Sequence, residues 1–195
     1  EGEAHAHDHE SEEEGANAGH SHTVDPHVWL DPVLAQTEVS TIAEGLAEAD
    51  PDNAEDYLEN AGIYNGKLNE LDEAYRAAFE GTENRTFVTQ HAAFAYLAAR
   101  YDLNQISVTG LNAEVEPSAA ALATLSDYVK ANNISHIYFE NNASSQTAET
   151  LAEEVGVELA VLSPLEGITE EDQKEGSDYI SVMLDNLEAL KKSIN

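Results

Sequence analysis

The chain has 195 residues, 42% hydrophobic and 24% charged, which is enough for one or two compact domains with a real core. Its 39 acidic and 8 basic residues give a formal net charge of −31, which excludes nucleic acid as a natural partner, because phosphate binding needs clustered Lys and Arg. The sequence has no cysteine, so disulfides and thiolate zinc sites are excluded and any metal site must use His, Asp or Glu.

The acidic surplus has two interpretations. It either attracts cations or keeps the surface solvated in a salty medium, where self-repulsion is screened. We favour the second, because the acids are spread over every predicted helix.

The chain starts with Glu1 and shows no signal-peptide pattern or lipidation cysteine, so it was either processed or is a piece of a longer protein, and the motifs below favour a piece. No apolar run is long enough to span a bilayer.

Residues 1–22, EGEAHAHDHESEEEGANAGHSH, contain no large apolar residue, so nothing in them offsets the entropy of ordering. We predict a disordered segment rich in His and acid. Its histidines follow an alternating pattern and are His5, His7, His9, His20 and His22. Imidazoles beside carboxylates make a loose, weak metal trap, and this spacing favours a metal-related loop over a solvated linker or a cloning tail.

Two helices are predicted next. The first covers residues 33–49 and ends at Asp50-Pro51; its apolar face comprises Val39, Ile42, Leu46 and Ala49. The second covers residues 52–81, with Asp52 and Glu55 in a capping-box pattern and Gly81 at its end. Its apolar stripe comprises Tyr57, Tyr64, Leu68, Leu71, Tyr75 and Phe79. At roughly 28 residues it would be about 40 Å long, which suits a strut.

Residues 82–195 contain four strand–helix units in succession. The predicted strands are residues 85–90, 105–110, 135–140 and 157–162, and the predicted helices are residues 92–101, 118–132, 145–155 and 177–194. Alternating βα units predict an α/β fold: a Rossmann-like lobe with a parallel sheet and helices on both faces, which follows the long helix. Ligands of such sheets bind outside the carboxyl ends of the strands.

Polar residues follow each predicted strand at that edge. His91 comes after the first strand and Glu166 after the fourth. The others are Thr109, Gly110, Glu114, Glu116, Glu140 and Asn141. Taken singly, a histidine at a strand end or a glutamate in a turn is more often a hydrogen-bonded structural residue. Together with His27 and the His-rich segment, however, His91 and Glu166 supply two imidazoles and a carboxylate. This is a common set of zinc ligands, which needs one more ligand or a water to be complete. Neutral imidazole suits zinc, whereas an all-oxygen set would suit manganese or calcium.

One histidine is predicted to be structural. His136 lies inside the third predicted strand, away from the ligand edge. The sequence also contains no G-x-G-x-x-G, Walker, H-E-x-x-H or G-x-S-x-G motif, so no other chemistry competes with the metal set.

Five stretches resemble the metal-specific solute-binding proteins of ABC importers, and especially the zinc-binding lipoproteins of Gram-positive bacteria. In order they are DPHVWLDP, FVTQHAAFAYLAARYDL, GLNAEVEPSAAAL, IYFENNASSQTAETLAEEVG and VLSPLEG. The resemblance implies two Rossmann-like lobes joined by a rigid long helix, with metal bound in the cleft between the lobes. Residues 23–51 would then end the N-terminal lobe, residues 52–81 would form the linking helix, and residues 82–195 the C-terminal lobe.

The resemblance also assigns ligands. His27 matches the histidine of the D-P-H-x-W motif, and His91 matches the ligand that opens the first helix of the second lobe, where manganese members tend to carry Glu. Glu166 matches the carboxylate after the last strand. Glu140 is kept as a less certain ligand, and residues 5–22 match the acidic, His-rich loop of zinc members.

The local motif suggests how His27 is held. Pro26 restricts the backbone beside it, and Trp29 and Leu30 can bury the start of the helical segment. Asp25 or Asp31 is expected to orient the second nitrogen of the imidazole.

The resemblance implies a protein that captures Zn²⁺ outside the cytoplasm and delivers it to an ABC permease. Such a protein would be a monomer, either free in the periplasm or held by a lipid anchor, and it would not be an enzyme. The first lobe and its histidine ligand are almost absent, so this chain matches the C-terminal two-thirds of such a protein. Two alternatives remain: a zinc hydrolase with Glu140 as base, and a metal-binding surface adhesin.

Overall fold

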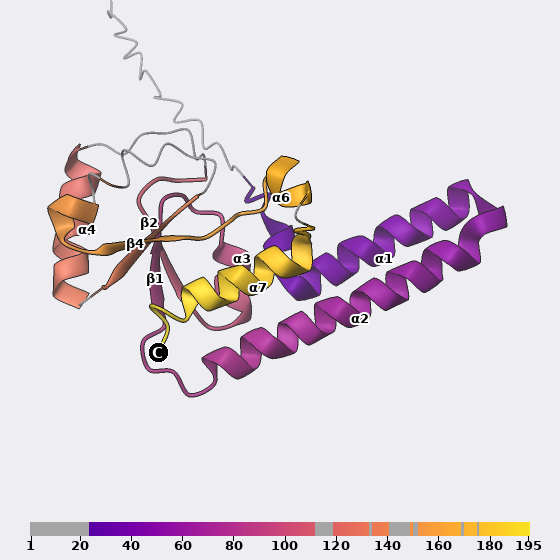
Figure 1. Cartoon of the computed structure of the whole chain (residues 1–195), viewed down its shortest axis with the longest axis horizontal. Coiled ribbons are helices and arrows are strands. Elements are labelled where there is room, and N and C mark those ends of the chain that lie inside the picture. Colours follow the sequence, from indigo (N-terminus) through magenta and orange to yellow (C-terminus); the bar gives the residue numbers. More distant parts are fainter. Residues whose placement is uncertain are drawn as a thin grey trace, which may run out of the picture.

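The computed structural model describes residues 24–111, 119–132, 134–140, 149, 152–168, 170–174 and 176–195. These residues form a helical hairpin that projects from an α/β lobe (Figure 1). The segment predicted to be disordered, residues 1–22, lies outside the described residues.

The hairpin starts with a 3-10 turn, η1 (Val28–Leu30), and continues as α1 (Pro32–Ala49), η2 (Pro51–Asn53) and α2 (Ala54–Phe79). Asp31 caps α1 by accepting hydrogen bonds from two backbone N–H groups of the first turn, at 2.8 and 3.4 Å. α2 has 26 residues, so it is about 39 Å long, in agreement with the predicted strut. Gly81 follows it with a φ of 74°, the left-handed conformation that commonly ends a helix.

Two details of the hairpin differ from the prediction. Asp52 lies in η2, and Asn53, at the N-cap of α2, makes no capping hydrogen bond with the described residues, so the predicted capping box is wrong. Asp50, in the turn between α1 and α2, forms the side-chain hydrogen bonds there instead. It accepts from Asn53 Nδ2 at 2.8 Å and from the Tyr57 hydroxyl at 2.9 Å. The distal half also projects beyond the lobe, so several apolar side chains on it are exposed: Ile42, Leu46, Leu58 and Ile63.

The lobe contains a four-stranded sheet in the order β2-β1-β3-β4, with parallel pairing throughout. Its strands are β1 (Thr86–Thr89), β2 (Asn104–Ser107), β3 (His136–Phe139) and β4 (Glu158–Val161). Its described helices are α3 (Ala95–Arg100), α4 (Ala119–Asn132), α6 (Glu170–Lys174) and α7 (Tyr179–Leu190). The predicted α/β fold class, with four parallel strands after a long helix, is confirmed.

Alternation along the strands creates one hydrophobic core on each face of the sheet. Phe87 and Tyr138 belong to the first core, and their neighbours Val88 and Ile137 belong to the second. Residues of α2, α3 and α7 close the first core, and residues of α4 close the second (Figure 1). The sheet is therefore covered on both faces, and its open edge at the carboxyl ends of the strands is free to carry a site.

Other element boundaries differ in detail. α3 is shorter than the predicted helix at residues 92–101, because residues 90–92 form bends after β1. Of the predicted helix at residues 145–155, residue 149 and residues 152–155 are described and are helical. α6 was not predicted, since its sequence, EEDQK, has no apolar spacing. Pro117-Ser118, which was expected to open α4, lies outside the described residues.

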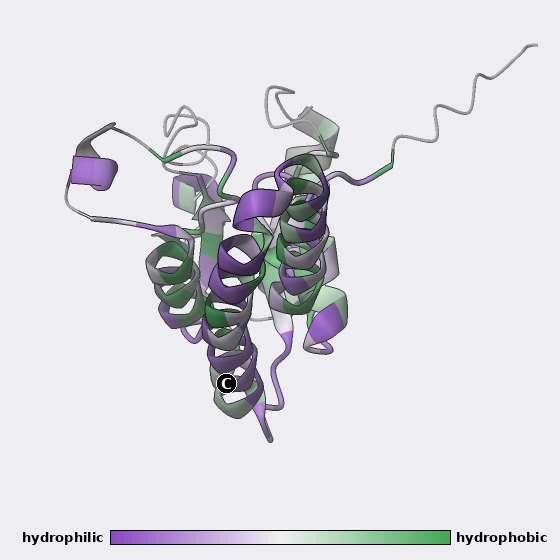
Figure 2. Cartoon of the chain, turned by 90° about the vertical axis from the view of Figure 1, so that its right-hand side faces the viewer, coloured by the Kyte–Doolittle hydropathy of each residue, from purple (hydrophilic) through white to green (hydrophobic). Residues whose placement is uncertain are grey.

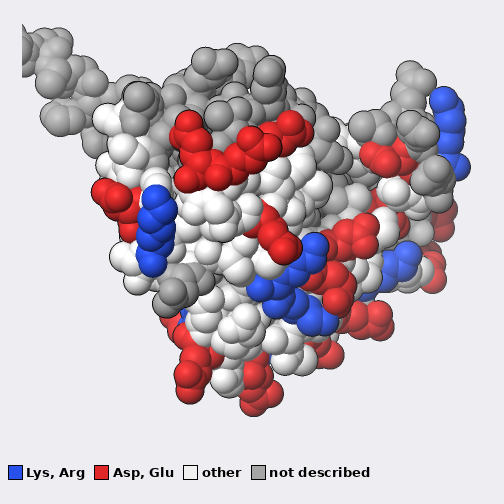
Figure 3. All heavy atoms as spheres, turned by 60° about the vertical axis from the view of Figure 1, so that its left-hand side comes forward, with Lys and Arg blue, Asp and Glu red and all other residues white. Residues whose placement is uncertain are grey.

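Charge is dispersed over the surface. Acidic side chains occur at several separate places on the face shown in Figure 3, with fewer basic ones between them. Hydrophilic and hydrophobic stretches alternate along the helices in Figure 2, as expected for amphipathic helices on a core. This distribution agrees with a generally acidic, solvated surface. Among the described residues, no helix is long and apolar enough to cross a membrane.

Candidate metal centre

Three predicted ligands converge at the carboxyl edge of the sheet. His27 directly precedes η1, His91 follows β1, and Glu166 follows β4. One ligand atom of each lies within 4.8 Å of the others. Glu166 Oε1 is 3.1 Å from His27 Nε2 and 3.7 Å from His91 Nε2. In a tetrahedral zinc site the ligand atoms are roughly 3.3 Å apart, so this cluster is close to the size that zinc requires.

Asp25 orients the first histidine. His27 is 2% exposed, and its Nδ1 lies 2.7 Å from Asp25 Oδ1, which also accepts from the His27 backbone N–H at 3.0 Å. Tyr96 of α3 holds Asp25 in turn, since its hydroxyl donates to the Asp25 carbonyl at 3.2 Å. With the Nδ1 proton in this bond, Nε2 is the nitrogen that faces Glu166.

Asp31, the other aspartate considered for that role, has a different one. Besides capping α1, its carboxylate pairs with Arg100 of α3, with Nε 2.9 and 3.0 Å from its two oxygens and Nη2 at 2.8 Å. Asp31 is buried, so this ion pair fixes the start of the hairpin against the lobe. Sequence reasoning missed Arg100, because no local pattern connects residues that lie 69 positions apart.

The second histidine is held from three directions. Its Nδ1 contacts Glu140 Oε1, and its backbone carbonyl accepts from Thr89 Oγ1 at 2.7 Å and from Gln105 Nε2 at 3.1 Å. His91 Nε2 is buried and has no hydrogen-bond partner among the described residues. A buried nitrogen without a partner is costly unless a ligand occupies it. Glu140 lies on the opposite side of the ring from this nitrogen, so it orients His91 and is not part of the converging group.

The carboxylate ligand lies on the open side of the site. The Glu166 side chain is 36% exposed, whereas both imidazoles are almost completely buried. Leu165 precedes it with a φ of 53°, a left-handed conformation that non-glycine residues rarely adopt and that is often found at functional sites. The candidate centre therefore consists of two buried nitrogens and one carboxylate that is partly exposed.

Other candidates from the sequence lie elsewhere. His136 starts β3, and its Nε2 is 3.4 Å from Glu158 Oε2 at the opposite end of the sheet. Thr109 donates to the Gln90 carbonyl at 3.0 Å. The remaining candidates lie outside the described residues: His5, His7, His9, His20, His22, Glu114, Glu116 and Asn141.

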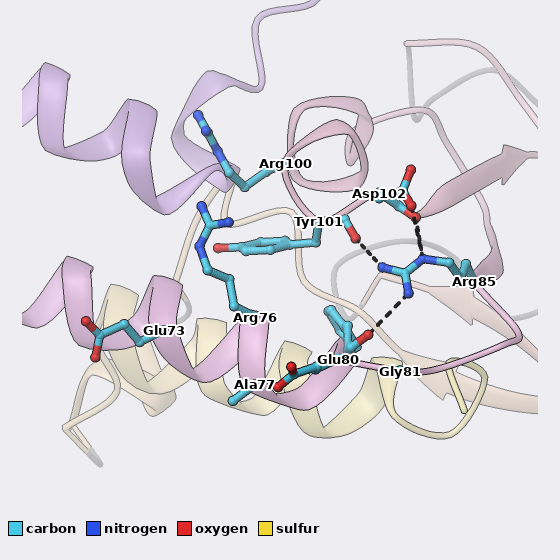
Figure 4. Close-up of a pocket in the computed structure, with 10 residues that line it drawn as sticks. Glu73, Arg76, Ala77, Glu80, Gly81, Arg85, Arg100, Tyr101 and Asp102 are labelled. Atoms are coloured by element: carbon cyan, nitrogen blue, oxygen red, sulfur yellow. Dashed lines mark hydrogen bonds and ion pairs between the residues drawn. The ribbon is translucent and has the colours of Figure 1, made fainter.

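A cavity of about 640 Å³ lies away from this centre, at the amino ends of β1 and β2 (Figure 4). It is lined by all the arginines of the sequence: Arg76, Arg85 and Arg100. Arg85 donates at 2.7 to 3.3 Å to carbonyls at the ends of α2 and α3, which are those of Phe79, Thr82, Tyr101 and Asp102. Arg76 and Arg100 pair with Asp72 and Asp31. Arg85 and Arg100 thus connect different helices, whereas Arg76 pairs within α2, and the candidate metal cluster is not part of this cavity.

Comparison with known proteins places the chain in a family. The profile of the family ZnuA, zinc-uptake complex component A periplasmic, matches residues 1–193. Zinc-binding protein AdcA of Streptococcus pyogenes serotype M6 is 54% identical over 173 residues, which are 89% of this chain and 34% of that protein. The chain thus spans about a third of the length of this relative.

Solved structures share the fold. The crystal structure of the Zn(II)-bound ZnuA-like domain of Streptococcus pneumoniae AdcA matches with a TM-score of 0.77 and 51% identity, over 87% of this chain and 63% of that chain. Laminin-binding protein Lmb of Streptococcus agalactiae, described as bifunctional with adhesin and metal-transporting activity, matches with a TM-score of 0.79 and 36% identity, over 87% of this chain and 64% of that chain. The resemblance inferred from the motifs is confirmed: the chain belongs to the ZnuA family of periplasmic zinc-uptake components.

Proposed function

We propose that this chain is the C-terminal part of an extracytoplasmic protein that captures Zn²⁺ and delivers it to an ABC permease. The observation that carries the proposal is the convergence of His27, His91 and Glu166 from three distant segments, with both Nε2 atoms facing one carboxylate. The family description supports the location and the role in zinc uptake. Zn²⁺ is therefore the cargo of the protein.

The donor set favours zinc over manganese. Two neutral imidazoles and one carboxylate are a frequent zinc environment, whereas manganese prefers oxygen ligands. Asp25 and Glu140 each face the Nδ1 atom of one histidine, which keeps both Nε2 atoms available. We therefore expect Zn²⁺ to outcompete Mn²⁺ at this centre.

The rest of the parent protein would complete the site. We propose that residues 23–51 end an N-terminal lobe, that residues 52–81 link the lobes, and that residues 82–195 form the second lobe. Two observations support this division: Glu166 is exposed on one side of the centre, and the distal hairpin presents apolar side chains to solvent, with Ile42 62% and Ile63 59% exposed. An N-terminal lobe would cover this hairpin and add a histidine as the fourth ligand.

Two other functions compete with zinc capture. A zinc hydrolase would need Glu140 as a base beside a metal-bound water, but this buried carboxylate contacts His91 Nδ1 on the side away from the converging atoms, which supports a non-enzymatic role. An adhesin is the second candidate, because the matching structure of Lmb is described as an adhesin with metal-transporting activity. Binding of the purified chain to immobilised laminin tests it and is compatible with zinc capture.

A calorimetric titration tests the main proposal. The chain is titrated with Zn²⁺ and with Mn²⁺, together with His91→Ala and, as a matched control, His136→Ala at the opposite end of the sheet. We expect Zn²⁺ to bind more tightly than Mn²⁺, His91→Ala to weaken zinc binding strongly, and His136→Ala to leave it unchanged. Tighter binding of Mn²⁺, or equal zinc binding by His91→Ala and the parent chain, would contradict the proposal.

A further inference from the structure

The only tryptophan of the chain connects the two metal-ligand segments that are farthest apart in the sequence. The ring of Trp29 lies edge-on to the imidazole of His27, with centroids 5.4 Å apart and planes at 61°. Its indole N–H donates to the Pro164 carbonyl at 2.9 Å, in the loop that presents Glu166. Its own carbonyl accepts from the Tyr179 hydroxyl of α7 at 2.6 Å.

Helix α7 also holds the Glu166 loop directly. Asn186 is 3% exposed and pairs through its amide with both backbone groups of Ser163, accepting from N–H at 2.8 Å and donating to C=O at 2.7 Å. Leu165, in its left-handed conformation, packs against the first hydrophobic core. One rigid helix thus binds both the turn after His27 and the strand end before Glu166.

We propose that Trp29 and Tyr179 are positioning residues of the metal centre, which hold the His27 turn and the Glu166 loop at the separation that one metal ion requires. This inference rests on the proposed function. Glu166 is the exposed member of the cluster, and among the described hydrogen bonds only those made by Trp29 and by His27 itself join its loop directly to the His27 turn. A loop that must be ordered when the metal binds lowers affinity, whereas a loop fixed beforehand does not.

The chemistry of both contacts suits a permanent tie. Burial is the main factor that raises the pKa of Tyr179, so its hydroxyl stays protonated and remains a donor at neutral pH. The indole N–H has no acceptor function and cannot change its role. Neither group is directed at the metal position, so each acts through the backbone of a ligand-bearing segment.

A purely structural role is distinguished from a positioning role by a matched control, a tyrosine of α2 whose hydroxyl bonds to α7. Tyr75 is fully buried, and its hydroxyl donates to the Met183 carbonyl of α7 at 2.7 Å. Tyr75→Phe and Tyr179→Phe therefore each remove one hydroxyl-to-carbonyl bond on α7 and retain the ring. Only Tyr179 contacts a segment that carries a ligand.

The experiment compares Trp29→Phe, Tyr179→Phe and Tyr75→Phe in the full chain. Zinc affinity is measured by titration, the geometry of the centre by the visible absorption of bound Co²⁺, and stability by thermal unfolding without metal. We expect Trp29→Phe and Tyr179→Phe each to weaken zinc binding about tenfold, which is about 1.4 kcal/mol, and to change the Co²⁺ spectrum. Tyr75→Phe should lower the unfolding temperature yet retain the affinity and the spectrum of the parent chain.

Failure of the inference is distinct from failure of the proposed function. If the parent chain binds Zn²⁺ and His91→Ala does not, but Trp29→Phe and Tyr179→Phe keep the affinity and spectrum of the parent chain, the positioning role is refuted and the metal centre stands. Equal losses in Tyr179→Phe and Tyr75→Phe would also refute it, because they would indicate a general effect of destabilising α7. If the parent chain itself does not bind Zn²⁺, the proposed function and the positioning role both fail.

Discussion

Glu140 offers the sharpest test of how the centre is prepared for metal. Its carboxylate is 3% exposed and contacts His91 Nδ1, so it requires the proton to be on that nitrogen and leaves Nε2 free. In Glu140→Gln the side chain keeps its shape but loses its charge. Its amide can also turn to donate an N–H to Nδ1, which allows the proton to move to Nε2 and block the metal-binding nitrogen.

The expected magnitude follows from this geometry. Loss of a carboxylate that orients a metal-binding histidine typically costs 10- to 100-fold in affinity, or about 1.4 to 2.7 kcal/mol, and burial leaves this contact unscreened by solvent. Stability should behave differently. Glu140→Gln removes a buried charge and retains a hydrogen bond, so the free energy of unfolding of the metal-free chain should change by no more than about 1 kcal/mol.

The assay is competition for Zn²⁺ against a chromophoric chelator, with chemical denaturation of the metal-free chains alongside. Glu158→Gln is the matched control, because Glu158 also faces a histidine, His136, at 3.4 Å, but on the surface at the other end of the sheet. Both variants change the net charge of −31 by the same one unit, so an effect of net charge alone is the same in both. Parent-like affinity in Glu140→Gln would refute the reasoning, and an equal loss in both variants would attribute it to overall charge.

Two further predictions concern the frame of the molecule. Arg85→Met removes the donors that join the ends of α2 and α3, so the free energy of unfolding should fall by about 2 to 3 kcal/mol. Urea denaturation measures this change, and an unchanged midpoint would contradict the role assigned to Arg85. Ile63→Asp should change the stability of this chain by less than about 0.5 kcal/mol, because the side chain is exposed, but should clearly lower the thermal unfolding temperature of a longer protein with an N-terminal lobe. Equal effects in the two proteins would show that no lobe covers this part of the hairpin.

Much of the fold was predictable, because periodicity reports burial on a sheet face or helix face. The strands around Phe87 and Ile137 were predicted from the sequence, and these two side chains lie in the two cores of the lobe. The position of His91 and Glu166 followed from the rule that parallel strands end at a common edge. The sequence could not show which nitrogen of each histidine faces Glu166, since that depends on contacts such as the one between His91 and Glu140, 49 positions apart.

The errors have physical causes as well. The predicted capping box at Asp52 is wrong because Asp50, two residues earlier, forms the side-chain hydrogen bonds of this turn, with Asn53 and Tyr57. The apolar face of α1 was identified by its spacing, but spacing does not tell what covers a face. Ile42 belongs to that pattern and is nevertheless 62% exposed, because the lobe described here does not extend so far along the hairpin.

The acidic surface and the metal centre make different contributions to recognition. At physiological ionic strength the field of surface charges decays over about 8 Å, so the dispersed acids raise the local concentration of every divalent cation without distinguishing among them. Discrimination must come from the donors, and under the proposed function it comes from two buried imidazoles whose Nδ1 atoms face Asp25 and Glu140. Raising the salt concentration should therefore weaken the binding of zinc and manganese to a similar degree and leave the preference for zinc unchanged.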